Sequence, residues 1–216
     1  MNRFYRRLAV AWLVSVGVGC TSAPVRYYTL TPTSDKNLPA SEAALAVDVR
    51  VLHIPPQLNR AELMVRTGPT EVIVLDNEQW VSPVKEEIKQ ALSLELRRRL
   101  GRLTVLRPGL AGLVLDIDVQ RLEAELGQYV LLEASWSATL SGADARSTGA
   151  RVTTCSFQAD QTIHGGYAEM VEGYQREIGT LADAIVAVLT SPASGSDAPC
   201  QRSIEGSAGG SGSENP

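Results

Sequence analysis

The sequence predicts an α+β fold in which two principal helices cover a mostly antiparallel sheet, all within a single domain. Several segments alternate apolar and polar residues with the period of two that a half-buried strand shows. Two later segments, starting near residues 83 and 167, instead repeat apolar residues at helical spacing. Because a helix with one apolar side packs on the apolar face of a sheet, these patterns together favour two layers around one core.

The first nineteen residues have the organisation of a secretory signal. Three arginines precede an apolar run over residues 8–18, which is shorter than the ~20 residues that a membrane-spanning helix needs. Small residues then precede Cys20 and resemble a lipobox, although Gly17 stands where an aliphatic residue is usual. We therefore expect cleavage after residue 19 and a covalent lipid on Cys20. The alternative is an ordinary cleaved signal in which Cys20 has no role.

The mature chain is expected to be a periplasmic domain that the lipid holds at the outer membrane. Thr21 follows the cysteine, whereas in similar lipoproteins an aspartate at this position favours the inner membrane. At the other end, residues 191–216 are rich in Ser, Gly and Pro and predict a disordered tail. The folded domain is thus expected over residues 20–190.

Charge and cysteine content limit the partners. The net charge of −4, which becomes more negative once the signal is removed, argues against nucleic acid and against a basic surface for anionic lipids. Besides Cys20, the chain has Cys155 and Cys200, and the periplasm is oxidising. We expect these two to form a disulfide; the alternative is a buried Cys155 and a free thiol at Cys200.

The strands are expected where apolar residues alternate and turn residues flank them. Val47, Val49 and Val51 alternate with Asp48 and Arg50, and Pro55 and Pro56 end that segment. A Thr-Gly-Pro-Thr turn at 67–70 predicts a hairpin. The full set of predicted strands is 27–30, 44–54, 62–66, 71–75, 104–106, 113–123, 129–140 and 152–163.

Two helices follow from helical spacing. The first is expected from Pro83 to about residue 100, with Ser82 as its N-cap and Gly101 at its end. Its last turn carries Arg97, Arg98 and Arg99, which suit the helix dipole; a phosphate or lipid-headgroup site is the alternative. The second helix, over residues 167–189, has one apolar stripe that we interpret as core.

The sequence shows no recognisable catalytic or metal-binding pattern. It lacks a nucleotide-binding loop, a nucleophile elbow and paired zinc-type cysteines, and its two histidines, His53 and His164, are far apart. Asp116 and Asp118 share one face of a strand and are interpreted as solvated carboxylates in preference to an acid/base or cation pair. We therefore expect no enzyme activity, no metal and no cofactor beyond the lipid on Cys20.

An ordered series of segments resembles the PqiC-like auxiliary lipoproteins of ABC-type transport systems, which accompany MCE-domain proteins in moving lipids between bacterial membranes. The similar segments extend from Cys20 to about residue 190. In order along the chain they are RYYTL at 26–30, IP at 54–55, LNR at 58–60, Leu63, Val65 and Arg66, Trp80 and Pro83, QRL at 120–122, LEASW at 132–136, and the last helix. Leu122, where an aromatic residue is common, and the long polar tail are departures.

The resemblance implies a non-catalytic subunit that docks onto an MCE-domain protein at the outer membrane and supports envelope integrity. As a hypothesis, Leu58, Arg60, Arg66 and Trp80 contribute to docking. The alternative is that Trp80 packs the helix onto the sheet and the arginines pair locally. A homo-oligomer is compatible with this interpretation. A structural assembly lipoprotein for another outer-membrane machine is the competing function, and an envelope hydrolase is a third.

Overall fold

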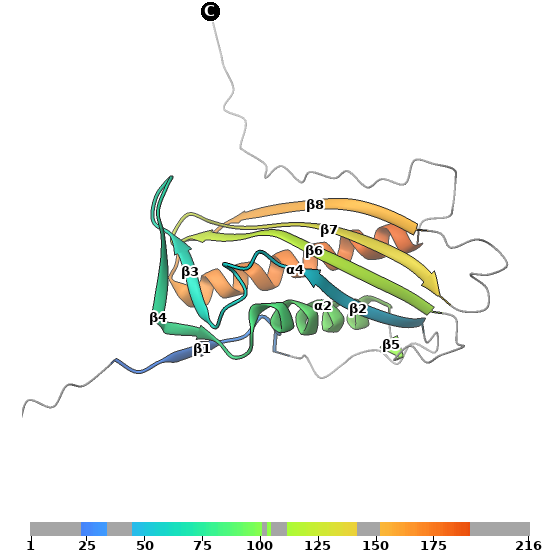
Figure 1. Cartoon of the computed structure of the whole chain (residues 1–216), viewed down its shortest axis with the longest axis horizontal. Helices are drawn as coiled ribbons and strands as arrows, with labels where there is room; N and C mark the ends of the chain where they lie inside the picture. Colours follow the sequence, from blue (N-terminus) through green and yellow to red (C-terminus); the bar gives the residue numbers. More distant parts are fainter. Residues whose placement is uncertain (1–22, 34–44, 101–102, 105–111, 142–151, 191–216) are drawn as a thin grey trace, which may run out of the picture.

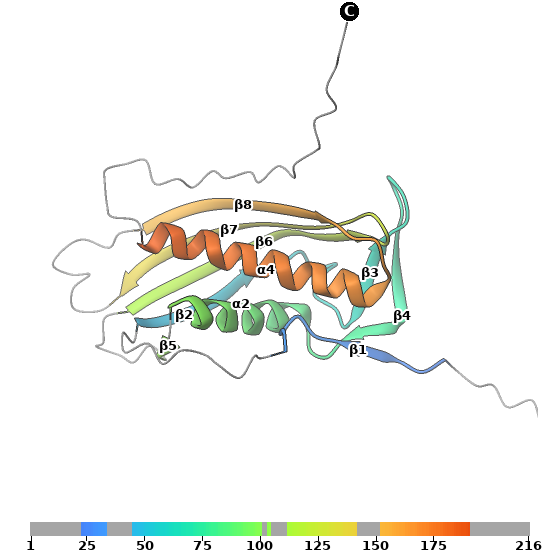
Figure 2. The ribbon, with the colours of Figure 1, turned by 180° about the vertical axis from the view of Figure 1, so that it is seen from behind.

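The computed structural model describes residues 23–33, 45–100, 103–104, 112–141 and 152–190. The expected signal, the expected lipidation site Cys20, Cys200 and the expected tail lie outside these residues. The described elements are arranged in two layers, a curved sheet and a pair of helices (Figure 1). Figure 2, seen from behind, shows both helices lying across the same face of the sheet.

The elements follow one another in nearly the predicted order. The helices are α2 (Val84–Leu100) and α4 (Tyr167–Thr190). The strands are β1 (Arg26–Tyr28), β2 (Leu45–His53), β3 (Glu62–Arg66), β4 (Val72–Trp80), β5 (Leu103–Thr104), β6 (Gly112–Glu125), β7 (Tyr129–Ser141) and β8 (Val152–Thr162). The predicted α+β class, with a mostly antiparallel sheet and two helices, is confirmed.

Strand β6 is the centre of the sheet, and its two edges differ. One edge pairs antiparallel with β7 along almost its whole length, and β7 pairs antiparallel with β8. The other edge pairs parallel with β2 as far as Asp118, and meets β3 at a single position, Arg66 opposite Glu125. The sheet is therefore mixed, and it forks where β6 passes from β2 to β3.

Two short strands extend this sheet at its margins. Strand β5 pairs parallel with the start of β2, and β1 pairs parallel with the end of β4. Strand β4 runs on to Trp80, past the predicted end at residue 75, because its second half is the partner of β1 while its first half forms the hairpin with β3. The second half of β4 is polar up to Trp80, so its sequence does not show the alternation of a strand.

The core lies between the sheet and the two helices. Alternate residues of β6 from Leu113 to Val119 are buried, and so are Ala134, Trp136 and Ala138 of β7. The helices contribute apolar faces that include Leu92 and Leu96 of α2 and Ile178, Leu181 and Ile185 of α4. The opposite face of the sheet is polar, so the fold has a single apolar layer. Burying apolar surface in that layer stabilises the fold by ~25 cal/mol per Å².

Helix α2 begins in a different way from the predicted N-cap. The Pro83 carbonyl accepts hydrogen bonds from the amides of Glu86 and Glu87, at 2.8 and 3.2 Å, so Pro83 occupies the cap position. The Ser82 hydroxyl instead donates to the Glu87 carboxylate at 2.5 Å. That carboxylate, only 2% exposed, also accepts from the Thr29 hydroxyl and the Leu30 amide. Glu87 therefore joins α2 to the segment that follows β1.

Candidate functional site

A groove lies in the fork of the sheet, at the part of β6 that pairs with neither β2 nor β3. Among the described strands, none pairs with residues 119–124 of β6 on this edge. The loop from Ile54 to Ala61 fills part of the space and folds back in two turns, with the Leu58 amide donating to the Pro55 carbonyl at 2.9 Å. The remaining cleft has a volume of about 210 Å³.

A β-bulge shapes the β6 side of this groove. The register between β6 and β7 shifts between Val119 and Arg121, so Gln120 is an extra residue in the ladder. Its amide donates to the Ser135 hydroxyl at 3.1 Å. The bulge changes the phase of the alternation, so that Leu122, 8% exposed, turns inward.

The groove has an apolar floor and a polar rim. Apolar side chains come from the loop, from both strands of the hairpin and from β6, and charged or amide groups stand around them. The lining residues are Gln57, Leu58, Met64, Arg66, Val72, Gln120, Arg121, Leu122, Glu123 and Ala124. None of them carries a hydroxyl, thiol or imidazole group. The lining thus suits an apolar side chain of a ligand or partner and offers no nucleophile.

The charges on the rim are paired with one another. Arg121 donates to both carboxylate oxygens of Glu123, at 3.1 and 2.9 Å, and Arg66 approaches the same carboxylate at 3.3 Å. The hydrogen bond from Arg121 holds the pKa of Glu123 below its ordinary value, and the charge of Arg66 adds to this. Because this acid is stabilised as the carboxylate, the rim favours fixed ion pairs over proton transfer.

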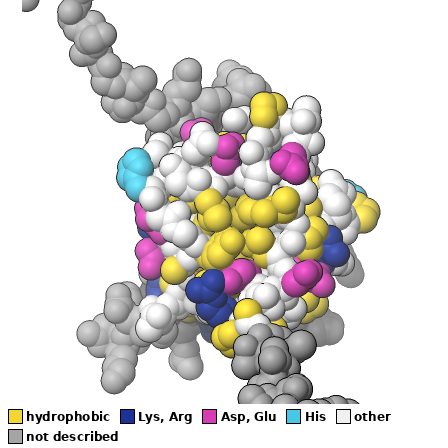
Figure 3. Space-filling model, turned by 90° about the vertical axis from the view of Figure 1, so that its left-hand side faces the viewer, with side chains coloured by type: hydrophobic (Ala, Val, Ile, Leu, Met, Phe, Trp, Pro, Cys, Tyr) yellow, Lys and Arg dark blue, Asp and Glu magenta, His cyan; other side chains and the backbone are white. Residues whose placement is uncertain are grey.

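The hairpin side of the groove is unusually apolar for a surface. Met64 lies opposite Val74 and Arg66 opposite Val72 in the β3–β4 ladder, so all four share one face of the hairpin. Val72, Ile73 and Val74 are each more than a third exposed. Figure 3, which views this end of the molecule, shows hydrophobic side chains gathered in the middle of the face with charged side chains around them. The groove therefore opens beside an exposed apolar strand.

The structure places the four residues of the docking hypothesis in different surroundings. Leu58 and Arg66 both line the groove. Arg60 lies beside it and pairs with Glu62 at 3.1 Å. Trp80 is 6% exposed and packs against Tyr174 of α4, with the ring centroids 6.4 Å apart. The groove thus brings two of the four together, while Trp80 packs in the core under the loop.

Sequence reasoning missed the β6 side of the groove. Its sequence does carry a signal, because the buried positions change from odd numbers up to Val119 to even numbers from Leu122. Such a change of phase within one strand indicates a bulge, and bulges are often found beside functional sites. Met64 and Val72 gave no comparable signal, because alternation within a hairpin does not show which face a loop will cover.

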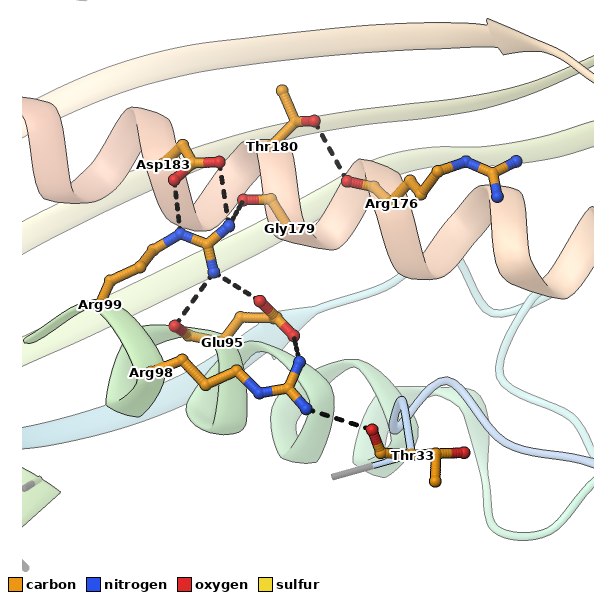
Figure 4. Close-up of polar contacts among 8 residues, drawn as sticks. All are labelled: Thr33, Glu95, Arg98, Arg99, Arg176, Gly179, Thr180 and Asp183. Carbon is orange, nitrogen blue, oxygen red and sulfur yellow. Dashed lines mark hydrogen bonds and ion pairs between the residues drawn. The ribbon is translucent and has the colours of Figure 1, made fainter. Parts of the chain in front are cut away.

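A second concavity, of about 500 Å³, lies between α2 and α4 and is lined by paired charged side chains. Arg99 donates to both carboxylate oxygens of Asp183 and to the Gly179 carbonyl, which links the two helices (Figure 4). Arg98 pairs with Glu95 at 2.7 Å. These two of the three arginines are therefore engaged in structural ion pairs, which is not what a phosphate or lipid-headgroup site requires.

Other groups singled out in the sequence also have structural surroundings. Asp116 forms a two-point ion pair with Arg50 of the neighbouring strand, at 2.6 and 2.9 Å. No cluster of three or more metal-binding side chains occurs within the described ranges. In the same residues, no helix has the length and apolar character to cross a bilayer. Cys155 is disulfide-bonded, and the cysteine that completes this bond lies outside the described residues.

Solved structures with a similar fold exist at low sequence identity. A crystal structure of an uncharacterized protein matches with a TM-score of 0.59 and 18% identity, covering 78% of this chain and 100% of the other. The protein XCC0632 from Xanthomonas campestris matches with a TM-score of 0.53 and 15% identity, covering 76% of this chain and 93% of its own. At such identities the likeness shows the fold alone. No curated protein matches the chain.

The sequence itself matches a family model over most of the domain. The matched residues, 28–186, run from the end of β1 to the last turns of α4 and include all of the groove. The family is described as the ABC-type transport auxiliary lipoprotein component. Because the match covers more than half of the chain, it confirms the family that the ordered segments predicted. This chain therefore belongs to the family of ABC-type transport auxiliary lipoproteins.

Proposed function

We propose that this protein is a non-catalytic subunit of an ABC-driven system for lipid transport between membranes. A lipid on Cys20 holds it at the periplasmic face of the outer membrane, and it docks there onto an MCE-domain protein. ATP hydrolysis and permeation belong to other polypeptides of the system. Membership of the auxiliary lipoprotein family supports the general role, and the resemblance seen in the sequence supports the MCE partner.

The groove in the fork of the sheet is the docking surface in this proposal. The observation that carries it is the apolar floor made by Leu58, Met64 and Val72, which adjoins the exposed start of β4. Surfaces that combine an apolar centre with a polar rim are typical of protein interfaces. The rim ion pairs contribute orientation more than affinity, because each charge already has a partner. A partner therefore gains chiefly by burying apolar side chains in the groove.

The proposal is tested by photo-crosslinking in intact cells. A photoreactive amino acid is placed at Met64 or at Val72, and at Gln158 on the exposed polar face of β8 as the control. We expect an MCE-domain protein to be captured from positions 64 and 72 but not from 158. Capture of only barrel or secretin components from these positions would contradict the MCE partner and favour the assembly role.

A matched pair of variants tests whether the groove carries affinity. Val72→Glu puts a charge at the apolar wall, and Thr154→Glu puts the same charge on the polar face of β8; both side chains are exposed in the folded chain. We expect Val72→Glu to lower recovery of the partner in a pull-down by about tenfold or more, since a charge without a partner opposes burial. Equal recovery with both variants would count against docking at the groove.

A further inference from the structure

The exposed apolar side chains of the described residues are concentrated on two paired strands. All of the large hydrophobic side chains that are exposed there lie on β1, on β4 or directly beside these strands. Three of them are Val72, Ile73 and Val74 at the start of β4, of which Val72 lines the groove. The other three are Val25, Tyr27 and Val81, which are 41%, 63% and 63% exposed and lie where β1 meets the end of β4. We call these three the anchor-side face.

The ladder between β1 and β4 places these three side chains on one side. Arg26 and Tyr28 both reach the buried carboxylate of Glu78, Tyr28 at 2.7 Å. Since side chains alternate along a strand, Val25 and Tyr27 point to the opposite side. Val81 follows the buried Trp80 and its amide donates to the Tyr28 carbonyl at 2.8 Å, so the alternation brings Val81 to the side of Tyr27. The three side chains therefore form a small apolar surface that no other described part of the chain covers.

The chain leading to this surface is short. Val25 is five residues after Cys20, and five residues span at most ~18 Å when fully extended. A lipid on Cys20 therefore keeps the anchor-side face within a short distance of the membrane. In Figures 1 and 2, β1 lies at one end of the molecule and on the opposite side from β8.

We propose that the anchor-side face lies directly against the lipid bilayer, with Tyr27 at the level of the headgroups. The inference rests on the lipid anchor of the proposed function and adds an orientation to it. Tyrosine suits this position because its ring is apolar and its hydroxyl can remain in contact with water. The neighbouring Arg26 pairs with Glu78 on the opposite side of the strand, so the contact is apolar and does not depend on anionic headgroups. The bilayer, through Val25, Tyr27 and Val81, fixes which side of the domain faces away from the membrane.

The test uses the full lipidated chain in vesicles of phosphatidylethanolamine and phosphatidylglycerol with brominated acyl chains, which quench nearby tryptophan. The variants are Tyr27→Trp and Val81→Trp, and the matched control is Gln158→Trp on exposed β8. The native Trp80 and Trp136 are buried and provide the same background in each sample. We expect the added fluorescence at positions 27 and 81 to shift to the blue and to lose most of its intensity, and that at 158 to do neither.

Flotation of the vesicles separates this inference from the proposed anchor. If the chain floats with the vesicles but positions 27 and 81 remain as unquenched as 158, the bilayer contact is overturned and the anchor stands. A partner protein would then be the better occupant of the anchor-side face. If the unaltered chain does not float at all, both the anchor and the contact are overturned.

Discussion

Glu177 stands out among the buried acids of this domain. Among the residues that the structure describes, four glutamates are at most 8% exposed, namely Glu78, Glu87, Glu95 and Glu177. The first three are held by arginine, hydroxyl or amide donors. Glu177 is 3% exposed, and its Oε2 atom has no hydrogen-bond partner among the described residues. Burial raises the pKa of Glu177 to about 7; the Asp160 carboxylate also raises it, and Arg176 lowers it.

The raised pKa of Glu177 makes stability depend on pH. In the unfolded chain an ordinary glutamate loses its proton near pH 4.5, whereas the folded chain holds the proton up to about pH 7. The folded state is therefore favoured at low pH, and this contribution is lost as the pH rises through the folded pKa. We expect Glu177→Gln, which keeps the shape without the charge, to raise the free energy of unfolding by about 2 kcal/mol at about pH 8.

Urea unfolding at several pH values measures this effect. The gain from Glu177→Gln should shrink toward about pH 4, where the glutamate is protonated in both states. The control is Glu172→Gln, whose side chain is 65% exposed on the same helix, and it should change stability little at either pH. A gain that is the same at every pH would mean that packing, and not ionisation, explains the effect.

At the scale of elements, Arg99 adds a set of polar bonds to the apolar contact between α2 and α4. Arg99 reaches from the last turn of α2 to Asp183 and to the Gly179 carbonyl, the latter at 3.0 Å, and also pairs with Glu95 at 2.5 Å. These partners raise the pKa of the Arg99 guanidinium above its ordinary value, with the hydrogen bond to Asp183 as the largest cause. The arginines at this helix end thus act in tertiary contacts more than as dipole caps.

We expect Arg99→Ala to lower the free energy of unfolding by about 2 kcal/mol, because the Gly179 carbonyl and Glu95 lose a charged donor. Arg97→Ala is the matched control, since Arg97 is exposed in the same turn, and it should cost much less. A double-mutant cycle with Asp183→Asn should give a coupling of only about 0.5 kcal/mol, because the Asp183 side chain is 67% exposed and water screens the pair. Equal losses from Arg97→Ala and Arg99→Ala would show that charge alone matters at this helix end.

The sequence could predict the helices and strands better than it could predict which strands pair with each other. Alternation located β2, β6, β7 and β8, and helical spacing located both helices, because these periods report which face is buried. They do not report which strand lies alongside, so the parallel pairing of β2 with β6 was not predicted. The fork in the sheet, and with it the groove, follows from that pairing. The second half of β4 was missed because its residues pair with a strand 52 positions earlier.

The candidate site was predictable only in part for the same reason. Leu58 lies in the loop that follows Pro55 and Pro56, and Arg66 ends strand β3 just before a turn, so both could be expected near the surface. Trp80 gave no such indication, since a large aromatic residue is equally compatible with an interface and with a core. Its burial follows from its place opposite Tyr28 in the β1–β4 ladder, which a single sequence does not show.

At the scale of the whole molecule, the domain has two proposed attachments, one to the bilayer and one to a protein partner. In the proposed arrangement, the lipid on Cys20 and the anchor-side face hold one side of the domain at the bilayer, and the groove beside the β3–β4 hairpin is left for a protein partner. The docking surface thus lies on the same strand, β4, whose other end is next to the anchor. A partner bound at the groove would be held close to the membrane surface.

The expected Cys155–Cys200 disulfide would join the C-terminal part of the chain to β8. Cys155 of β8 is 4% exposed and disulfide-bonded, and the chain has three cysteines in all. A lipid on Cys20 uses that thiol, which leaves Cys200 as the partner. We expect non-reducing digestion of the mature protein to yield one peptide pair that joins Cys155 to Cys200, and reduction to separate it, as measured by mass spectrometry.

The variant Cys200→Ser should leave Cys155 as a buried thiol that reacts with an alkylating reagent only after unfolding. The loop that the bond closes has about 45 residues, for which loop-closure entropy gives about 4 kcal/mol. Because unfolded chains retain some residual structure, we expect a smaller loss of stability, about 2 kcal/mol. The same digestion also tests the anchor, because a peptide pair joining Cys155 to Cys20 is incompatible with a lipid on that sulfur. Such a pair would contradict both the disulfide and the lipidation that the sequence predicts.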